Sequence, residues 1–241
     1  YIVNDSCASV IFTGDQHQYE IALQLLEECP SLKHIVTFDP KVVRVEGDET
    51  TLSWQEFINL GANAGNDVRT TVEQRSANGS PDDIMYLIYT SGTTGAAKGV
   101  MLSHRNLCQN ITASWYTYHV NKRDVFLSIL PMAHTYEMSI GMLYPFSRGA
   151  KVVYIQKPPT PAVLIPAFKQ VRPTTVLTVP LIIEKIYRSS VLPTIRKSTF
   201  LSWLDSWAPK LLARLVGHKL IKTFGGRLKF FGVGGSKMDI E

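Results

Sequence analysis

The chain has 241 residues, 45% of them hydrophobic and 19% charged, a composition that excludes a globally disordered chain. Its net charge of +5 and pI of about 9.1 fit an anionic partner, but it has no dense Lys/Arg run of the kind that marks nucleic-acid binding. Three scattered cysteines, Cys7, Cys29 and Cys108, form no CxxC pair, which argues against a disulfide framework and a zinc site. A membrane-spanning helix would require an apolar run of about 18 residues, and the sequence has no such run.

Strand-like and helix-like patterns alternate along the chain. In order, the sequence predicts a strand at 8–13, a helix at 16–28, a strand at 34–38, a helix beginning near Thr51 or Ser53 and running to 64, a loop at 75–83, a buried strand at 84–89, a helix at 103–118, a strand at 125–130, a helix at 136–146, a strand at 151–155, a helix at 161–171, a strand at 174–179, a helix at 181–188, a mostly helical basic stretch at 192–224 and a strand at 228–233. This alternation predicts an α/β fold with layered, largely parallel sheets flanked by helices. The chain opens on Tyr1 without the pattern of a signal peptide, and we interpret it as beginning within a longer chain.

A Gly/Thr-rich segment, YTSGTTGAAKGV, follows the apolar strand at 84–89. Glycines allow a tight turn and a close approach of the backbone to a ligand, and successive N–H groups and hydroxyls donate to phosphate oxygens. The P-loop motif does not match, because it needs Gly before its Lys and Ser or Thr after it, whereas Ala97 and Gly99 flank Lys98 here. By composition alone, a flexible surface turn would be the better interpretation.

The order of residues in this segment resembles the phosphate-binding signature of the AMP-forming, adenylate-making enzymes, the superfamily of acyl-CoA synthetases, luciferases and peptide-synthetase adenylation domains. Ala97 stands where that family usually has Pro, a change that removes no functional group. The resemblance implies that the segment binds the phosphates of ATP, that Lys98 is catalytic, and that Thr90 also approaches Mg²⁺. The implied nucleotide-binding residues of this segment are Thr90, Ser91, Gly92, Thr93, Thr94, Gly95 and Lys98.

A second segment, LPMAHTYE at 130–137, resembles another signature of the family in its long-chain fatty acyl form. The resemblance assigns His134 to the acyl pocket, beside the bound carboxylate and adenylate, as a catalytic residue. Alone, such a histidine would be interpreted as structural. Glu137, three residues later, could share a helix face with His134 and is interpreted as structural, and no third ligand suggests a metal site.

A third segment, RLKFFGVGGSKM at 227–238, resembles the strand and glycine turn that hold the adenine. Gly234, Gly235 and Ser236 are the implied adenine-binding residues, and Ser236 and Lys237 depart from the family's commonest residues. Without the other two segments, a generic tight turn would explain the pattern equally well.

The resemblance covers essentially the whole chain and implies that residues 1–241 are part of the large N-terminal adenylation domain, with the small C-terminal domain absent. The family's Mg²⁺-binding glutamate, ribose-binding aspartate and C-terminal catalytic lysine have no counterpart here. We therefore expect these residues alone to be inactive.

The implied activity is that of a long-chain fatty acid–CoA ligase, which converts a carboxylate, ATP and CoA to acyl-CoA, AMP and pyrophosphate through acyl-AMP. The implied partners are a long-chain fatty acid, ATP with Mg²⁺, and CoA as co-substrate. We expect no nucleic-acid partner, and we expect the protein to be cytoplasmic. The basic stretch at 192–224 is interpreted as a solvated helix face or as a peripheral membrane contact. Open alternatives are a fatty acyl-AMP or acyl-carrier-protein ligase, a non-catalytic nucleotide-binding relic, and an ADP-forming kinase.

Overall fold

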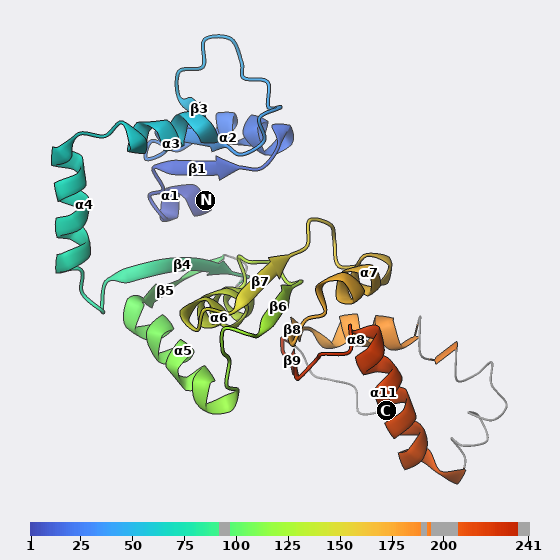
Figure 1. Ribbon diagram of the computed structural model, residues 1–241. Helices are drawn as coiled ribbons and strands as arrows, with labels where there is room; N and C mark the ends of the chain where they lie inside the picture. Colours follow the sequence, from blue (N-terminus) through green and yellow to red (C-terminus); the bar gives the residue numbers. More distant parts are fainter. Residues whose placement is uncertain (92–96, 189–191, 194–206, 236–241) are drawn as a thin grey trace. The chain divides into compact units, whose positions relative to one another are not determined.

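The computed structural model describes residues 1–91, 97–188, 192–193 and 207–235 (Figure 1). The chain divides into two compact units, residues 1–105 and residues 106–241. Each unit carries its own parallel sheet, so the layered α/β fold expected from the alternating pattern is confirmed.

The first unit is built around a three-stranded parallel sheet in the order β1-β2-β3. Its elements are α1 (Ile2–Asp5), β1 (Val10–Thr13), α2 (Gln16–Glu28), β2 (His34–Thr37), β3 (Thr51–Ser53), α3 (Trp54–Ala62) and α4 (Asn66–Asn78). Tyr19 and Ala22 of α2 pack on Ile35 of β2 to form the core. Ser53 and Glu56 form a capping box, which explains why α3 begins directly after β3.

A buried tyrosine ties the long connection between β2 and β3 to this core. The Tyr19 hydroxyl donates to Asp48 at 2.8 Å and accepts from the backbone N–H of Val45. Burial raises the pKa of Asp48, but hydrogen bonds from Thr51, Thr50 and Tyr19 outweigh it and bring that pKa to about 2. The ionised Asp48 therefore stabilises the folded connection.

An antiparallel hairpin of β4 (Ile84–Thr90) and β5 (Lys98–Ser103) completes the first unit. Two expectations are wrong in this region. The loop expected at 75–83 is helical up to Asn78, since α4 continues until Gly79 ends it. The strand expected to be buried leaves its apolar side chains exposed, with Ile84 at 59% and Met85 at 44%, because a two-stranded hairpin cannot cover both of its faces.

The second unit holds a four-stranded parallel sheet in the order β7-β6-β8-β9. Its elements are α5 (His104–Thr117, which begins in the first unit), β6 (Val125–Ser128), the π-helix η1 (Glu137–Leu143), α6 (Tyr144–Ser147), β7 (Lys151–Tyr154), α7 (Pro161–Val171), β8 (Thr175–Thr178), α8 (Pro180–Ile186), α11 (Pro209–Thr223) and β9 (Phe230–Val233). The main core lies between this sheet and α7, where Phe168 packs edge-on against Phe224. A second cluster, Val120, Phe126 and Tyr144, lies under the start of β6 and α6.

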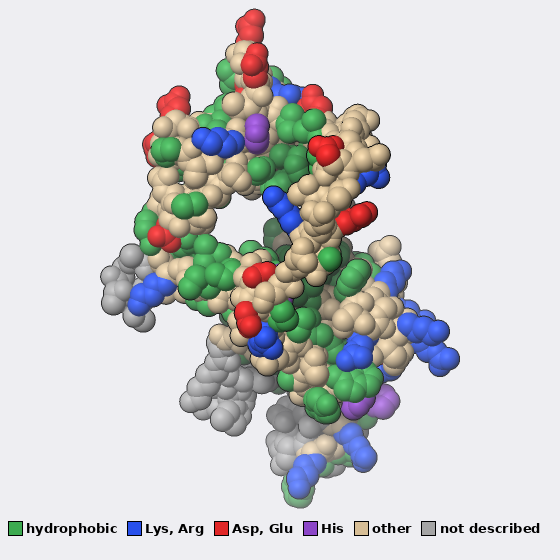
Figure 2. Space-filling view, turned by 90° about the vertical axis from the view of Figure 1, so that its left-hand side faces the viewer, with side chains coloured by type: hydrophobic (Ala, Val, Ile, Leu, Met, Phe, Trp, Pro, Cys, Tyr) green, Lys and Arg blue, Asp and Glu red, His purple; other side chains and the backbone are tan. Residues whose placement is uncertain are grey.

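Charge is unevenly divided along the chain. Residues 1–105 contain 7 Lys and Arg against 14 Asp and Glu, a formal charge of −7, and residues 106–241 contain 18 against 6, a formal charge of +12. Figure 2 shows acidic, basic and hydrophobic side chains all reaching the surface. Within the described part of the chain, no helix has both the length and the apolar character needed to cross a bilayer.

Candidate functional site

The β4–β5 hairpin holds the two ends of the Gly/Thr-rich segment side by side. Thr90 and Lys98 are register partners in the antiparallel ladder, and both are exposed. Opposed residues of such a ladder project from the same face, so the Thr90 hydroxyl and the Lys98 ammonium flank the mouth of the connection together. Ser91 follows Thr90 and is exposed, whereas the predicted residues Gly92, Thr93, Thr94 and Gly95 lie outside the described residues.

The ring of Tyr89 explains why a glycine, with no side chain, occupies position 99. A Cβ atom at Gly99 would lie 3.2 Å from Cζ of the Tyr89 ring and 3.1 Å from Leu87, both on the paired strand. The Tyr89 hydroxyl donates to Asp5 at 2.6 Å, and this hydrogen bond to a carboxylate raises the pKa of Tyr89 to about 12. The ring therefore lies across the hairpin over Gly99, on the face opposite to that of Thr90 and Lys98, and the small residue after the lysine makes room for it.

His134 lies in the second unit, on the segment between β6 and η1. Its Nδ1 accepts a hydrogen bond from the backbone N–H of Tyr136 at 3.2 Å. In the neutral ring this assigns the proton to Nε2, and the exposed side chain is free to present that N–H to a ligand. His134 precedes the helix on which Glu137 lies, so the two do not share a helix face, contrary to expectation.

The predicted glycine turn follows β9 directly. The N–H of Gly234 donates to the carbonyl of Thr178 at the end of β8, and Gly235 has a φ of +87°. A left-handed backbone of this kind favours glycine, and it lies just past the carboxyl end of β9. The carboxyl ends of parallel strands are the usual ligand-binding edge of such sheets. Ser236 lies outside the described residues.

Tyr136, which the sequence did not single out, links the His134 segment to the glycine turn. A Cβ atom at Gly234 would lie 3.3 Å from the Tyr136 ring, and one at Gly232 would lie 2.8 Å from its hydroxyl. Burial, and secondarily the charge of Glu137, raise the pKa of Tyr136, so its phenol is neutral at physiological pH. The two segments predicted to border the acyl and adenine groups are thus neighbours within the second unit.

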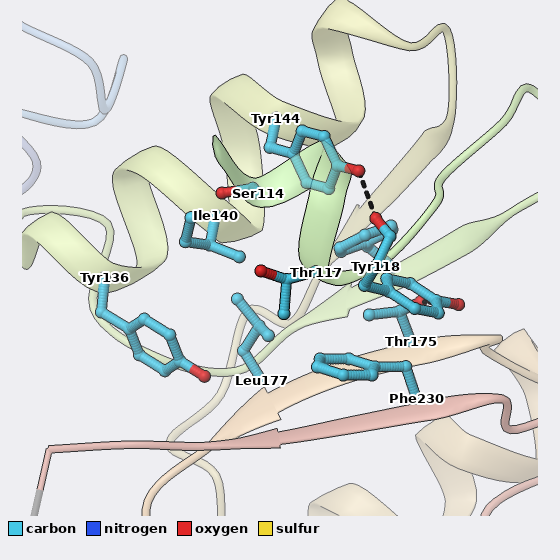
Figure 3. Close-up of a pocket in the computed structure, with 10 residues that line it drawn as sticks. Ser114, Thr117, Tyr118, Tyr136, Ile140, Tyr144, Thr175, Leu177 and Phe230 are labelled. Atoms are coloured by element: carbon cyan, nitrogen blue, oxygen red, sulfur yellow. Dashed lines mark hydrogen bonds between the residues drawn. The ribbon is translucent and has the colours of Figure 1, made fainter. Parts of the chain in front are cut away.

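A mostly apolar cavity of about 200 Å³ lies beside Tyr136 (Figure 3). The Tyr118 ring stacks on Phe230 at a centroid distance of 4.3 Å, and its hydroxyl lies 3.2 Å from that of Thr175. The Tyr144 hydroxyl in turn donates to the carbonyl of Tyr118. These contacts fix the aromatic wall. The lining residues are Ser114, Thr117, Tyr118, Phe126, Tyr136, Ile140, Tyr144, Thr175, Leu177 and Phe230.

A second, more polar hollow of about 400 Å³ adjoins this cavity. It is lined by Asn110 and Ala113 of α5 and by Thr135 and Ser139 near η1. Both spaces share four lining residues, namely Ser114, Thr117, Tyr136 and Ile140. Together they form one groove between α5 and η1 that is polar at one end and apolar at the other.

Glu137 lies beneath this groove and is 1% exposed. Its Oε2 has no hydrogen-bond partner, and burial raises its pKa, with a hydrogen bond from Ser128 offsetting part of the effect. Its carboxyl packs against Gly141 within the π-helix η1 and is not among the side chains that line the groove. Among the described residues, no group of three or more His, Cys, Asp or Glu side chains could hold a metal ion.

The chain is similar to curated long-chain acyl-CoA ligases over most of its length. It is 29% identical over 215 residues to the long-chain-fatty-acid–CoA ligase ACSBG2 of Gallus gallus, covering 86% of this chain and 27% of that protein. It is 30% identical over 258 residues to the peroxisomal long chain acyl-CoA synthetase 7 of Arabidopsis thaliana, covering 99% and 35%. The chain thus spans about a third of the length of these relatives.

Solved adenylation-domain structures share its fold. The A domain of a carboxylic acid reductase from Segniliparus rugosus, in complex with AMP and a co-purified carboxylic acid, matches with a TM-score of 0.69 at 22% identity, covering 99% of this chain and 39% of that one. ATP-bound MatB from Rhodopseudomonas palustris matches with a TM-score of 0.63 at 18% identity, covering 98% and 37%. The family model described as AMP-binding enzyme matches residues 1–241, and the chain therefore belongs to the AMP-binding, adenylate-forming enzyme family.

Proposed function

We propose that this chain supplies the phosphate-binding and acyl-binding parts of a long-chain fatty acid–CoA ligase. The observation that carries the proposal is the groove between α5 and η1, whose apolar end is walled by Tyr118 and Phe230 and whose rim meets Tyr136 beside the glycine turn. The apolar end lies against the first residues of β8 and β9, Thr175 and Phe230, and Tyr136 joins the rim to the glycine turn that follows β9. An apolar cavity with a few convergent polar groups suits an amphipathic substrate.

The size of the groove bears on the length of the acid. A cavity of about 150 Å³ accommodates benzene, so the inner space of about 200 Å³ takes only part of a long chain. The adjoining hollow of about 400 Å³ provides the remaining room. The carboxyl group would then lie toward Tyr136 and His134, where the Nε2–H of His134 can donate to it.

In the first half-reaction, an oxygen of the fatty carboxylate attacks the α-phosphorus of ATP, and pyrophosphate leaves. Thr90, Ser91 and Lys98 would hold the β- and γ-phosphates, since Lys98 supplies a cation and the hydroxyls supply donors at the mouth of the hairpin. Mg²⁺ would arrive with ATP as part of the substrate complex. The Thr90 hydroxyl fits as one of its ligands, because Mg²⁺ is commonly bound through substrate phosphates, waters and few protein oxygens.

In the second half-reaction, the thiol of CoA attacks the acyl carbonyl carbon, and AMP leaves. We further propose that residues 1–241 alone do not turn over, because the family's catalytic lysine and ribose-binding aspartate have no counterpart among them. The adenine would rest on Gly234, Gly235 and Ser236.

The test is the formation of AMP and pyrophosphate by the full-length protein from ATP, Mg²⁺ and palmitate, with and without CoA. Sustained AMP and palmitoyl-CoA formation that requires CoA is the expected result. Pyrophosphate release indifferent to CoA would instead support an acyl-AMP or acyl-carrier-protein ligase. ADP formation, or no reaction with any carboxylate, would refute adenylation by this protein.

Two substitutions test the assigned residues. Lys98→Met and His134→Ala should each lower kcat/KM for palmitate by about 10²-fold, the usual effect of removing one positioned donor. Lys41→Met and His17→Ala are matched controls, since both residues are exposed and lie outside the proposed site. Equal losses in the controls and the site variants would remove the support for these roles.

A further inference from the structure

An ion pair joins two strands at the amino end of the second unit's sheet. Asp124 directly precedes β6, its side chain is 1% exposed, and its Oδ1 accepts a hydrogen bond from Nζ of Lys229 at 2.9 Å. Lys229 directly precedes β9, and its side chain is 55% exposed. The Oδ2 of Asp124 accepts from the backbone N–H of Asn121 at 3.0 Å. Each oxygen of this buried carboxylate therefore has a donor, as a charge removed from water requires.

Thr174, which directly precedes β8, lies between the two partners, since β8 is the strand between β6 and β9. Its carbonyl accepts from the N–H of Lys229 at 2.8 Å, and its hydroxyl accepts from the N–H of Val125 at 2.9 Å. We name Asp124, Thr174 and Lys229 the strand clamp. Burial raises the pKa of Asp124, but hydrogen bonds from Lys229, Asn121 and Thr174 outweigh it and hold that pKa below its ordinary value. The clamp therefore holds an ionised carboxylate at neutral pH.

The residues that follow the clamp form one wall of the acyl groove. Phe126, Thr175 and Phe230 are register partners on β6, β8 and β9, and all three line the apolar cavity. Tyr118 covers two of them, because its ring stacks on Phe230 and its hydroxyl lies 3.2 Å from that of Thr175 (Figure 3). Phe230 is the residue next to Lys229, so a movement of the chain at Lys229 displaces Phe230 and the ring stacked on it.

This wall lies at the inner end of the groove. Tyr118, Thr175 and Phe230 line the apolar cavity but not the adjoining polar hollow, whereas Tyr136 lines both. With the carboxyl group toward Tyr136, the part of an acyl chain that fills the cavity ends at the rings of Tyr118 and Phe230. A long acid meets these rings, and a short acid does not reach them.

We propose that the strand clamp limits the length of the acyl chain that the groove accepts, because it holds Phe230 and Tyr118 in place. Asp124 and Lys229 are positioning residues, since they act through Phe230 and line neither space of the groove. Without the ammonium group, the buried carboxylate lacks its cation, a costly arrangement that the first residues of β9 relieve by moving. The inference rests on the proposed ligase function, since it takes the occupant of the cavity to be an acyl chain.

The test compares laurate, palmitate and arachidate as ligands and substrates of the full-length protein. Lys229→Met should raise the ratio of kcat/KM for arachidate to that for laurate by about tenfold, the smaller effect that one methylene group has in an apolar pocket. Calorimetric titration should show the same change in the ratio of the two dissociation constants. Phe230→Leu shortens the wall itself and should raise both ratios as well. Lys229→Arg keeps the charge and should keep the wild-type ratios.

The control is Arg44→Met, which breaks the exposed ion pair of Arg44 with Glu56 in the first unit and changes no residue that lines the groove. Its ratios should stay within about twofold of the wild type, since an exposed ion pair contributes little. Thermal unfolding checks that each variant is folded. If Lys229→Met does not fold, Asp124→Asn with Lys229→Gln leaves a neutral pair and no buried charge, and the same rise in the ratios is expected.

A structural role alone would lower kcat/KM for every acid by the same factor and leave the ratios unchanged. Unchanged ratios in a folded, active clamp variant would therefore overturn the inference and leave the ligase proposal standing. Absence of turnover by the wild type with every acid would refute the ligase proposal, and the dissociation constants would still decide whether the clamp limits chain length. Binding of none of the three acids would overturn both.

Discussion

Gly232 of β9 is the position where one added methyl group most directly perturbs the proposed acyl groove. A Cβ atom there would lie 2.7 Å from Cδ2 of Leu177 and 2.8 Å from the hydroxyl of Tyr136. Favourable contacts between such atoms lie near about 3.5–4.0 Å, so both side chains would have to move. Both of them line the groove, so a displacement of either side chain changes its shape.

Gly232→Ala should therefore destabilise the fold by about 1–3 kcal/mol, the usual cost of overpacking a filled interior. It should also push Tyr136 toward the groove and weaken palmitate binding. A penalty of about 1.4 kcal/mol on the bound state alone corresponds to a tenfold rise in Kd. Urea unfolding measures the first effect, and calorimetric titration of the full-length protein with palmitate measures the second.

Two further variants make the reasoning refutable. Gly232→Ala combined with Tyr136→Phe removes the hydroxyl that the methyl group meets and should recover part of the lost stability. Gly61→Ala, in α3, is the matched control, because no atom lies within 4 Å of its added Cβ. That change should stabilise the protein by about 0.5–1 kcal/mol, as expected for glycine in a helix. Unchanged stability and palmitate binding in Gly232→Ala would show that the close contacts do not constrain the groove.

Three further substitutions test other parts of the structure. Asp48, with a folded pKa of about 2 against an ordinary 3.8, contributes about 2 kcal/mol that is present above pH 4 and lost as pH falls toward 2. Asp48→Asn should remove that contribution at pH 7 and flatten the acid limb of a urea-unfolding series. Glu137 has a pKa raised by burial, so its contribution is complete below about pH 4.5 and declines as pH rises through the raised value. Glu137→Gln should therefore raise Tm relative to the wild type at pH values above the raised pKa of Glu137, where the wild-type carboxyl ionises. A gain in Tm that is the same at every pH would contradict a raised pKa for this carboxyl. Gly141→Ala places a Cβ 2.6 Å from the Glu137 carboxyl and should destabilise η1 by about 1–3 kcal/mol, as measured by urea unfolding.

Local signals in the sequence determined most elements. The helices at Gln16–Glu28 and Pro161–Val171 have the predicted bounds, because a capping Asp15 and an N-terminal Pro161 are signals carried within a few residues. The strands of the parallel sheets were predicted to within a few residues, since their apolar runs are continuous, except for the short strand β3 (Thr51–Ser53), where the sequence predicted only the start of a helix. Family membership also followed from contiguous motifs, and the family model that matches the whole chain confirms it.

The predicted secondary structure or burial was wrong where residues outside the local segment determined the structure. Residues 75–78 have the composition of a loop, but they extend a helix already formed by the residues before them. The apolar sequence of β4 predicted a buried strand, yet its only strand partner among the described residues is β5. The sequence pattern shows that a strand is apolar, but it does not show which elements cover that strand. The expected helix at 136–146 is a π-helix followed by α6, around a buried Glu137 that spacing alone could not reveal.

The phosphate-binding segment could be found from sequence because its donors are consecutive residues. The groove could not, because its wall joins Tyr118, Tyr136, Leu177 and Phe230, which come from four separate parts of the chain. None of these residues carries a local signal, since an aromatic or aliphatic side chain has the same pattern in a core as in a binding site. Tertiary structure alone decided that Tyr136 crosses the end of β9, because that contact depends on the missing side chain of Gly232 and on the parallel order of β8 and β9.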